Sequence, residues 1–298
     1  MSTSKDGIKV NPKYKDRLFC LLFGNRENIL SLYNALNGTQ YANPEDIEIT
    51  TIEDAVYIKM KNDVSFLIDS YLTLWEQQST FNPNMPLRGL MYFGNLYDAY
   101  IDKNEINIYG RKLARIPTPR YIVFYNGTEE KEETMELKLS DAFMNEDRSG
   151  NFEWTATMIN LNRGKNKKLL EQCRILSDYM FFIECIRKYV KDGMKIEDAV
   201  DAAVDECIAG NVLAEFLQKH RAEVRSMCIT EYNEKVFVNG IKEEGREEGI
   251  KEGIKEGIKE GTARTLVSLV KKGLLAPEEA AAEMGMPLEE FRKLRFEN

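Results

Sequence analysis

Apolar and polar residues alternate along the stretch "DVSFLIDSYLTLWEQQST", which starts at Asp63 and predicts two short strands joined by a tight turn. If Asp69 and Ser70 form a two-residue turn, Asp63 lies directly opposite Glu76 on one face of the sheet. Their Cβ atoms would then be about 5 Å apart. A shift of one residue would pair Asp63 with Gln77 instead. The simplest turn therefore brings two carboxylates together.

The remaining pattern predicts a mixed α/β region up to about residue 165 and almost only helices beyond it. Gly24 is expected to end a first helix and Asn25 to start a second. Further strands are expected at 46–54, 55–60, 118–127, 134–143 and 152–161, and further helices at 85–102, 167–190, 195–210 and 212–237. We accordingly divide the chain into an α/β core (1–165), a helical extension that packs on it (166–240), a repeat segment (241–261) and a small helical tail (262–298).

The repeat segment "IKEEGREEGIKEGIKEGIKEG" has a period of four residues. Glycine recurs at every fourth position from Gly245 to Gly261, and isoleucine falls at Ile241, Ile250, Ile254 and Ile258. In an α-helix each residue type then forms its own slowly rotating stripe. Every interior glycine costs a helix about 1 kcal/mol relative to alanine. Two interpretations stay open: a solvated, partly frayed helical spacer, or a helix that packs closely on a partner through these stripes. A phosphate-binding loop is excluded, because no GxxxxGK[ST] follows a strand.

The tail after the repeat segment predicts short helices. Gly273 is placed as a helix C-cap, and two later helices each open with a proline followed by acids. A small helical hairpin so rich in glutamate is a poor reader of DNA. We therefore expect a module for packing or for oligomerisation.

Composition narrows the choice of function classes. The chain has 298 residues, of which 43% are hydrophobic and 30% charged, and no apolar run reaches the length of a membrane span. The start of the chain lacks the apolar core of a signal peptide, so a cytoplasmic protein is expected. The five cysteines are scattered without a CxxC, which favours reduced thiols over a zinc site. With a net charge of −8, any contact with nucleic acid requires a local basic surface.

The sequence contains one histidine, His220, and this low number excludes several kinds of active site. Ser-His-Asp and Cys-His catalysis and multi-histidine metal sites need histidines that this chain lacks. His220 lies in a mostly polar helical stretch and is expected to be a solvated helix residue. Any catalysis must therefore be built on carboxylates, amides and lysines, with or without a hard metal ion.

The hairpin carries the candidate chemistry. Facing acids repel each other unless a cation lies between them or one takes up a proton. Two carboxylates at this spacing suit Mg²⁺, which binds oxygen ligands. The structural alternative is that both acids are polar residues at the rim of a strand. Against it, Glu76 interrupts an otherwise apolar strand, where burial of an unpaired carboxylate is costly, and Gln78 adds an amide on the same face.

The order of an acid, a strand and then Glu-x-Lys resembles the core of the PD-(D/E)xK nucleases. Here it reads Asp63-x12-Glu76-x-Gln78, with glutamine at the usual lysine position. The following "STFNPNMPLRGLMYF", the later "YIVFYNG" and the early "YKDRLFCLLFG" resemble the recombination-promoting nuclease branch, also described as PD-(D/E)xK family transposases. The resemblance covers about residues 10–240. It implies a restriction-endonuclease-like mixed sheet flanked by helices, followed by an α-helical C-terminal half.

The resemblance also implies roles for single residues. Asp63 and Glu76 would hold Mg²⁺ or Mn²⁺ with the Gln77 carbonyl, and Asp16 would close the site from the first helix. A metal-activated water would attack the phosphodiester bond of DNA. Gln78 would stand at the lysine position, where it can orient water or phosphate but supplies no positive charge. The implied activity is that of a metal-dependent DNA endonuclease.

Local basic residues are the candidate contacts to DNA. Arg88, on the helix after the motif, is a candidate phosphate ligand, with a role on the helix surface as the alternative. Two basic stretches are further candidates, with solvated loops as the alternative: Arg111, Lys112 and Arg115 in the first, and Lys165, Lys167 and Lys168 in the second. Two rival functions stay open. One is a non-catalytic protein of the same fold that binds DNA or a partner, and the other is a homo-oligomeric scaffold built on the C-terminal helices.

Overall fold

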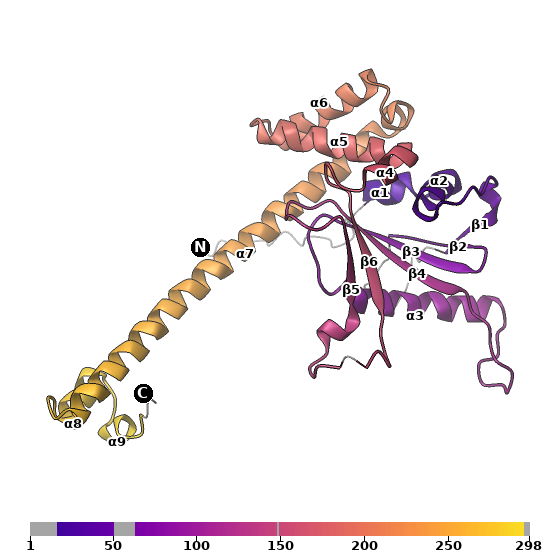
Figure 1. Cartoon of the computed structure of the whole chain (residues 1–298). Helices are drawn as coiled ribbons and strands as arrows, with labels where there is room; N and C mark the ends of the chain where they lie inside the picture. Colours follow the sequence, from indigo (N-terminus) through magenta and orange to yellow (C-terminus); the bar gives the residue numbers. More distant parts are fainter. Residues whose placement is uncertain (1–16, 51–62, 148, 295–298) are drawn as a thin grey trace, which may run out of the picture. The chain divides into compact units, whose positions relative to one another are not determined.

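The computed structural model describes residues 17–50, 63–147 and 149–294, which form a mixed α/β sheet region and a helical C-terminal half (Figure 1). The sheet has six strands in the order β1-β2-β3-β4-β6-β5. Their bounds are β1 (Ile47–Ile49), β2 (Val64–Ile68), β3 (Tyr71–Gln78), β4 (Thr118–Tyr125), β5 (Thr134–Lys138) and β6 (Thr155–Asn160). The sheet is open and mixed, in agreement with the α/β class expected from the sequence.

Strand direction creates one edge at which several strands end together. β3, β4 and β6 run parallel to one another, whereas β2 is antiparallel to β3 and β5 is antiparallel to β6. The carboxyl ends of β3, β4 and β6 therefore lie at the same edge as the start of β2. We call this edge the carboxyl edge. Polar residues at the ends of these strands can meet there although they are far apart in sequence.

The hairpin register predicted from the two-residue turn is confirmed. Val64 pairs with Trp75 and Ile68 with Tyr71, so Asp69 and Ser70 form the turn. Asp69 has a φ of 56°, in the left-handed region that aspartate tolerates better than most residues. Asp63 directly precedes β2 and so comes opposite Glu76.

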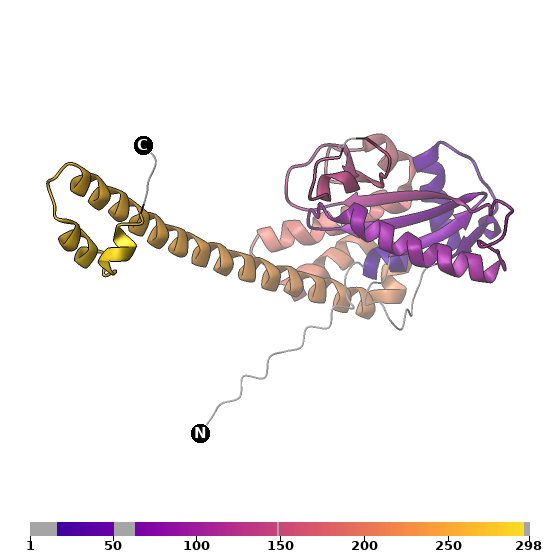
Figure 2. The same cartoon turned by 90° about the horizontal axis from the view of Figure 1, so that it is seen from below.

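Helices cover both faces of the sheet. On one face lie α1 (Arg17–Leu22), α2 (Arg26–Asn37), α4 (Lys167–Gln172), α5 (Arg174–Lys191) and α6 (Ile196–Ala209). Their apolar residues form a single core with residues of β1, β2, β3, β4 and β6. The opposite face is covered by α3 (Met85–Lys103), which Figure 2 shows in purple lying along the strands. The described residues of this region also form two 3₁₀ helices, η2 (Pro44–Asp46) and η3 (Leu139–Ala142).

Trp75 fixes which face of β3 each side chain takes. Its indole is fully buried on the α1 face, with ring centroids 4.8 Å from Phe66, 6.0 Å from Phe124 and 6.2 Å from Phe23. Because strand side chains alternate, the next residue, Glu76, must point to the α3 face. Packing of the tryptophan thus commits the carboxylate to one side of the sheet.

Most predicted elements are present. The strand expected at 134–143 ends at Lys138, and the rest of it forms the 3₁₀ helix η3, because Ser140 and Asp141 favour turns over strands. The break at Gly24 and the start at Asn25 are confirmed, since the Asn25 side chain accepts from the backbone N–H of Asn28 at 2.8 Å. The helix expected at 167–190 is divided into α4 and α5, because the backbone at Cys173 is extended. Of the strand expected at 46–54 only β1 is present in the described part, and the strand expected at 55–60 lies outside the described residues.

The chain divides into two compact units, Met1–Tyr232 and Asn233–Asn298. Helix α7 (Ala214–Lys271) contributes to both and contains the repeat segment. It departs from helical geometry at His220, whose side chain is 27% exposed and lies against Phe216, so this histidine is less solvated than expected. No helix in the described parts of the chain is both long and apolar enough to cross a membrane.

The second unit has a small apolar core of its own. Residues near the end of α7 pack against α8 (Pro277–Glu283) and α9 (Leu288–Phe291), with Leu266, Ala280 and Phe291 buried. The predicted C-cap is confirmed, because Gly273 has a φ of 70° and its backbone N–H donates to Val270. The C-terminal end of α7 is therefore held in a small packed unit with α8 and α9.

Close packing of α3 on the sheet gives a first testable prediction. A Cβ built on Gly89 would come within 2.3 Å of the buried Tyr121 ring, whereas one built on Gly94 of the same helix would meet nothing within 4 Å. We expect Gly89→Ala to lower the free energy of unfolding by about 1–3 kcal/mol. Gly94→Ala should raise it by about 0.5–1 kcal/mol, because alanine is the better helix former. Urea unfolding measures both, and equal stability of the two variants would contradict this packing.

Candidate functional site

Asp63 and Glu76 are joined by reciprocal hydrogen bonds across the hairpin. The backbone N–H of Asp63 donates to Oε1 of Glu76 at 3.3 Å. The backbone N–H of Gln77 donates to Oδ2 of Asp63 at 2.7 Å. Each carboxylate is therefore held by the main chain of the opposite strand, which fixes both side chains at the carboxyl edge.

Glu76 also forms an ion pair with α3. Nη2 of Arg88 lies 3.0 Å from Oε2 of Glu76 and 2.9 Å from the hydroxyl oxygen of Tyr92, one helical turn further along. The Glu76 side chain is 1% exposed, whereas that of Arg88 is 30% exposed. The guanidinium thus supplies the positive charge that two facing acids require.

The surroundings of this ion pair strengthen it. Burial disfavours the charged form of Arg88, but Glu76 and the hydrogen bond with Tyr92 outweigh burial, so the pKa of Arg88 is raised above its usual value. Burial, and then the charge of Glu76, raise the pKa of Tyr92 and of Tyr121, so both phenols stay neutral. Neutral buried groups screen charge poorly, so Glu76 and Arg88 interact more strongly than at a surface.

The oxygen donors at this site suit a hard divalent cation. Asp63 and Glu76 supply carboxylates, and the carbonyl of Gln77 points to the same side of β3 as its N–H, toward Asp63. Two carboxylates and a carbonyl are ligands that Mg²⁺ accepts together with waters. Within the described residues no group of three or more His, Cys, Asp or Glu side chains comes together for metal binding.

The two glutamines that follow Glu76 differ in environment. Gln77 points to the α1 face and is buried, and its side-chain Nε2 has no hydrogen-bond partner. Gln78, which stands where the PD-(D/E)xK motif usually has lysine, is half-buried at the last position of β3. Its alternation with Glu76 and Leu74 places it on the α3 face, as the sequence predicts.

A network at the ends of β4 and β6 was not foreseen from the sequence. The backbone N–H of Asn126 donates to the Gln78 carbonyl at 3.1 Å. Arg187 of α5 donates to the Asn126 carbonyl and, at 3.3 Å, to the side-chain oxygen of Asn162. Asn162 in turn donates to Gly127 at 2.9 Å. The arginine thereby ties the ends of β4 and β6 together next to Gln78. Of this network, only the pair Asn126-Gly127 is recognisable in the sequence, because Asn-Gly is typical of turns.

The structure brings only some of the predicted DNA contacts to the site. Arg88 lies in it, and Lys165, which is paired with Glu130 at 3.0 Å, belongs to the β6–α4 turn at the same edge. The exposed Lys167 and Lys168 open α4 there as well. Asp16 lies outside the described residues.

The other basic stretch lies far from the site. The exposed residues Arg111, Lys112 and Arg115 follow the end of α3, whereas Arg88 lies in its first turn. A helix of 19 residues is about 28 Å long, which separates these arginines and lysine from the carboxylates. They can therefore contact only a ligand that extends along the whole sheet.

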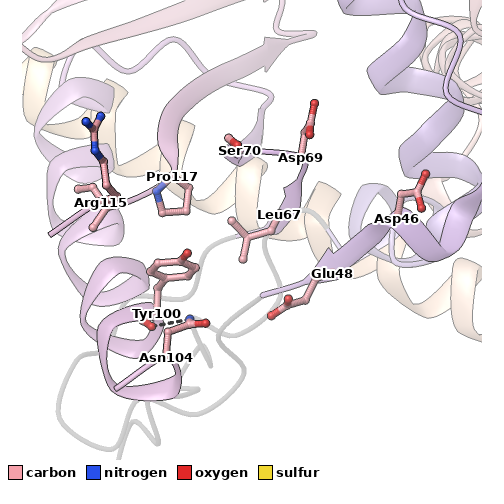
Figure 3. Close-up of a pocket in the computed structure, with 10 residues that line it drawn as sticks. Asp46, Glu48, Leu67, Asp69, Ser70, Tyr100, Asn104, Arg115 and Pro117 are labelled. Carbon is pink, nitrogen blue, oxygen red and sulfur yellow. Dashed lines mark hydrogen bonds between the residues drawn. The ribbon is translucent and has the colours of Figure 1, made fainter. Parts of the chain in front are cut away.

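A cavity of about 370 Å³ lies at the opposite edge of the sheet, next to the β2–β3 turn (Figure 3). Asp46 and Glu48 stand on one side of it and Tyr100, Asn104 and Arg115 on the other. Among the residues that line this cavity, only Arg115 was predicted to bind substrate, and neither Asp63 nor Glu76 is present. The candidate site is therefore a polar edge of the sheet and not this cavity.

Comparisons with models of protein families, with curated proteins and with solved structures found no match to this chain in any of the three. The case for a function therefore depends on the residues and their geometry.

Proposed function

We propose that the protein is a metal-dependent endonuclease of the PD-(D/E)xK type that hydrolyses phosphodiester bonds in DNA. The observation that carries this proposal is the pair of Asp63 and Glu76, held in reciprocal hydrogen bonds at the carboxyl edge of a mixed sheet. A restriction-endonuclease-like arrangement of the sheet and the transposase-like branch of the family belong to the same proposal.

The residues of the chain have distinct roles in this proposal. Asp63, Glu76 and the Gln77 carbonyl bind the cation, which lowers the pKa of water and offsets charge on the phosphate when it is bound. Gln78 orients water or phosphate through its amide but supplies no charge. Arg88 supplies the missing positive charge, because its guanidinium is 3.0 Å from Glu76 and still partly exposed, so it can also donate to a phosphate oxygen. Asp16, which lies outside the described residues, would complete the site.

DNA would approach from the carboxyl edge. Lys165, Lys167 and Lys168 lie at this edge and can neutralise backbone phosphates near the site. Arg111, Lys112 and Arg115 would contact the same duplex only about 28 Å away, which is roughly eight base pairs of B-DNA. The net charge of −8 implies that the rest of the surface repels DNA.

A second candidate function follows from the ion pair itself. Oε1 of Glu76 accepts from the Asp63 backbone and Oε2 from Arg88, so both oxygens of this carboxylate already have donors within the chain. In a non-catalytic protein of the same fold, Arg88 would take the place of the cation permanently. Such a protein would bind DNA or a partner without cleaving it.

Dependence on a divalent cation tests the two candidates. The wild-type protein is expected to nick supercoiled plasmid with Mg²⁺ or Mn²⁺ and to lose this activity in excess chelator, because the cation offsets the charge on the phosphate. Gel analysis of the plasmid gives the rate, and a fluorescence-anisotropy titration of duplex DNA gives the affinity. Cleavage that persists in chelator would contradict the metal site. DNA binding without cleavage under every condition would favour the non-catalytic candidate.

A further inference from the structure

The glycines of the repeat segment lack the packing reason that explains Gly89 of α3. Gly89 faces the Tyr121 ring so closely that a Cβ could not fit. By contrast, a Cβ added to Gly249, Gly253 or Gly257 would meet nothing within 4 Å. Glycine weakens a helix, so a regular series of glycines without close contacts in the described part of the chain calls for a reason outside that part.

A row of exposed isoleucines runs beside these glycines on α7. Ile250, Ile254 and Ile258 are 51%, 58% and 66% exposed, which is unusual for residues of this size in a regular series. Each directly follows a glycine, so a ridge of isoleucines lies next to a groove lined by glycines. One surface therefore carries both a row of knobs and a row of holes at the same four-residue spacing.

We propose that this face of α7 is the interface of a homodimer, in which the isoleucine ridge of one copy fits the glycine groove of the other. Helices that pack through i±4 ridges cross at about −50°, and small residues in the grooves let the two backbones approach closely. Because ridge and groove have one spacing, a second copy of this chain matches them without any further partner. The proposal does not depend on the nuclease activity.

Charge along the segment is compatible with self-association. Each "IKEG" tetrad has one lysine and one glutamate and so no net charge, whereas the whole chain carries −8. The three tetrads of two copies can thus come together without the repulsion that the rest of the surface would produce. The lysine and the glutamate of each tetrad also supply both signs of charge for contacts between two copies.

Replacement of glycine by alanine distinguishes an interface from a spacer. Alanine stabilises the helix in the separate chain, but at an interface it also weakens dimerisation. In Gly253→Ala/Gly257→Ala the added methyl groups raise the helical content of the separate chain. In the dimer the same methyl groups fill the groove and should weaken dimerisation about tenfold or more. The expected result for the full-length variant is therefore higher helicity by circular dichroism together with a higher dissociation constant by sedimentation equilibrium.

Two further variants complete the experiment. Gly94→Ala adds a methyl group to an exposed helical glycine outside the segment and should leave the dissociation constant unchanged. Ile254→Lys replaces one isoleucine of the ridge at a position that is exposed in the monomer. This variant should be monomeric at concentrations at which the wild-type protein is a dimer. A wild-type protein that is monomeric at all concentrations measured would overturn the proposal. So would a dimer with the same dissociation constant in the alanine double variant.

Discussion

Replacement of Arg88 by methionine is expected to lower the free energy of unfolding by about 3 kcal/mol. Methionine keeps the aliphatic stem but removes the guanidinium from the Glu76 carboxylate, which is 1% exposed. Removal of one partner of a buried pair costs about 3–5 kcal/mol, and the partial exposure of Arg88 places this case at the lower end. Denaturant unfolding of the variant and the wild type measures the difference.

Removal of the other charge of the pair should lower the free energy of unfolding much less. Glu76→Gln leaves Arg88 with the Tyr92 hydroxyl and with access to solvent, so a loss of about 1 kcal/mol is expected. The double variant Glu76→Gln/Arg88→Met should recover most of the stability, because it removes both charges of the pair together. Equal losses for both single variants would show that Glu76 is not buried as a charged group.

Mg²⁺ provides a second measurement on the Arg88 variant. If a cation and Arg88 compete for Glu76, Mg²⁺ should raise the melting temperature of Arg88→Met more than that of the wild type, because a ligand stabilises the state that it binds. An identical response of both proteins would contradict a metal site at Glu76. The ion pair would then have a structural role only.

Glu76→Gln and Asp63→Asn are each expected to reduce metal-dependent cleavage of plasmid DNA by more than about 100-fold. Loss of a group that only supports a metal ligand costs about 10–100-fold, so loss of a ligand should exceed this range. Both amides keep the size of the acids and can still accept the hydrogen bonds from the Asp63 and Gln77 backbones. Single-turnover cleavage rates at saturating Mg²⁺ measure the effect.

Asp69→Asn is the matched control for these variants. Asp69 lies in the turn of the same hairpin, at its opposite end, where it accepts from the Tyr41 hydroxyl at 3.0 Å. Its replacement should leave the cleavage rate within about twofold, since a surface change far from the site has little effect. Similar losses in Asp69→Asn and Glu76→Gln would show that the hairpin matters as a structural element, and that Glu76 has no chemical role.

The pairing of Asp63 with Glu76 could be predicted because it depends on local rules. A two-residue turn fixes the register, and alternation along the strand fixes the face. Helix α3, its first-turn Pro86 and the break at Gly24 also follow from signals within a few residues. The division of the helix at Cys173 could not be predicted, because the flanking residues keep helical spacing and only tertiary packing decides where the backbone becomes extended.

The sequence by itself determined that two carboxylates face each other at the end of an apolar strand, that no histidine chemistry is available, and that a helical half follows the sheet. Only the tertiary structure decided which positively charged side chain pairs with Glu76. Arg88 and Glu76 are 12 residues apart, and their contact requires that α3 packs on the face that Trp75 leaves to Glu76. A spacing in sequence can place a charge on a strand, but which charge meets it depends on how the helices pack across the sheet.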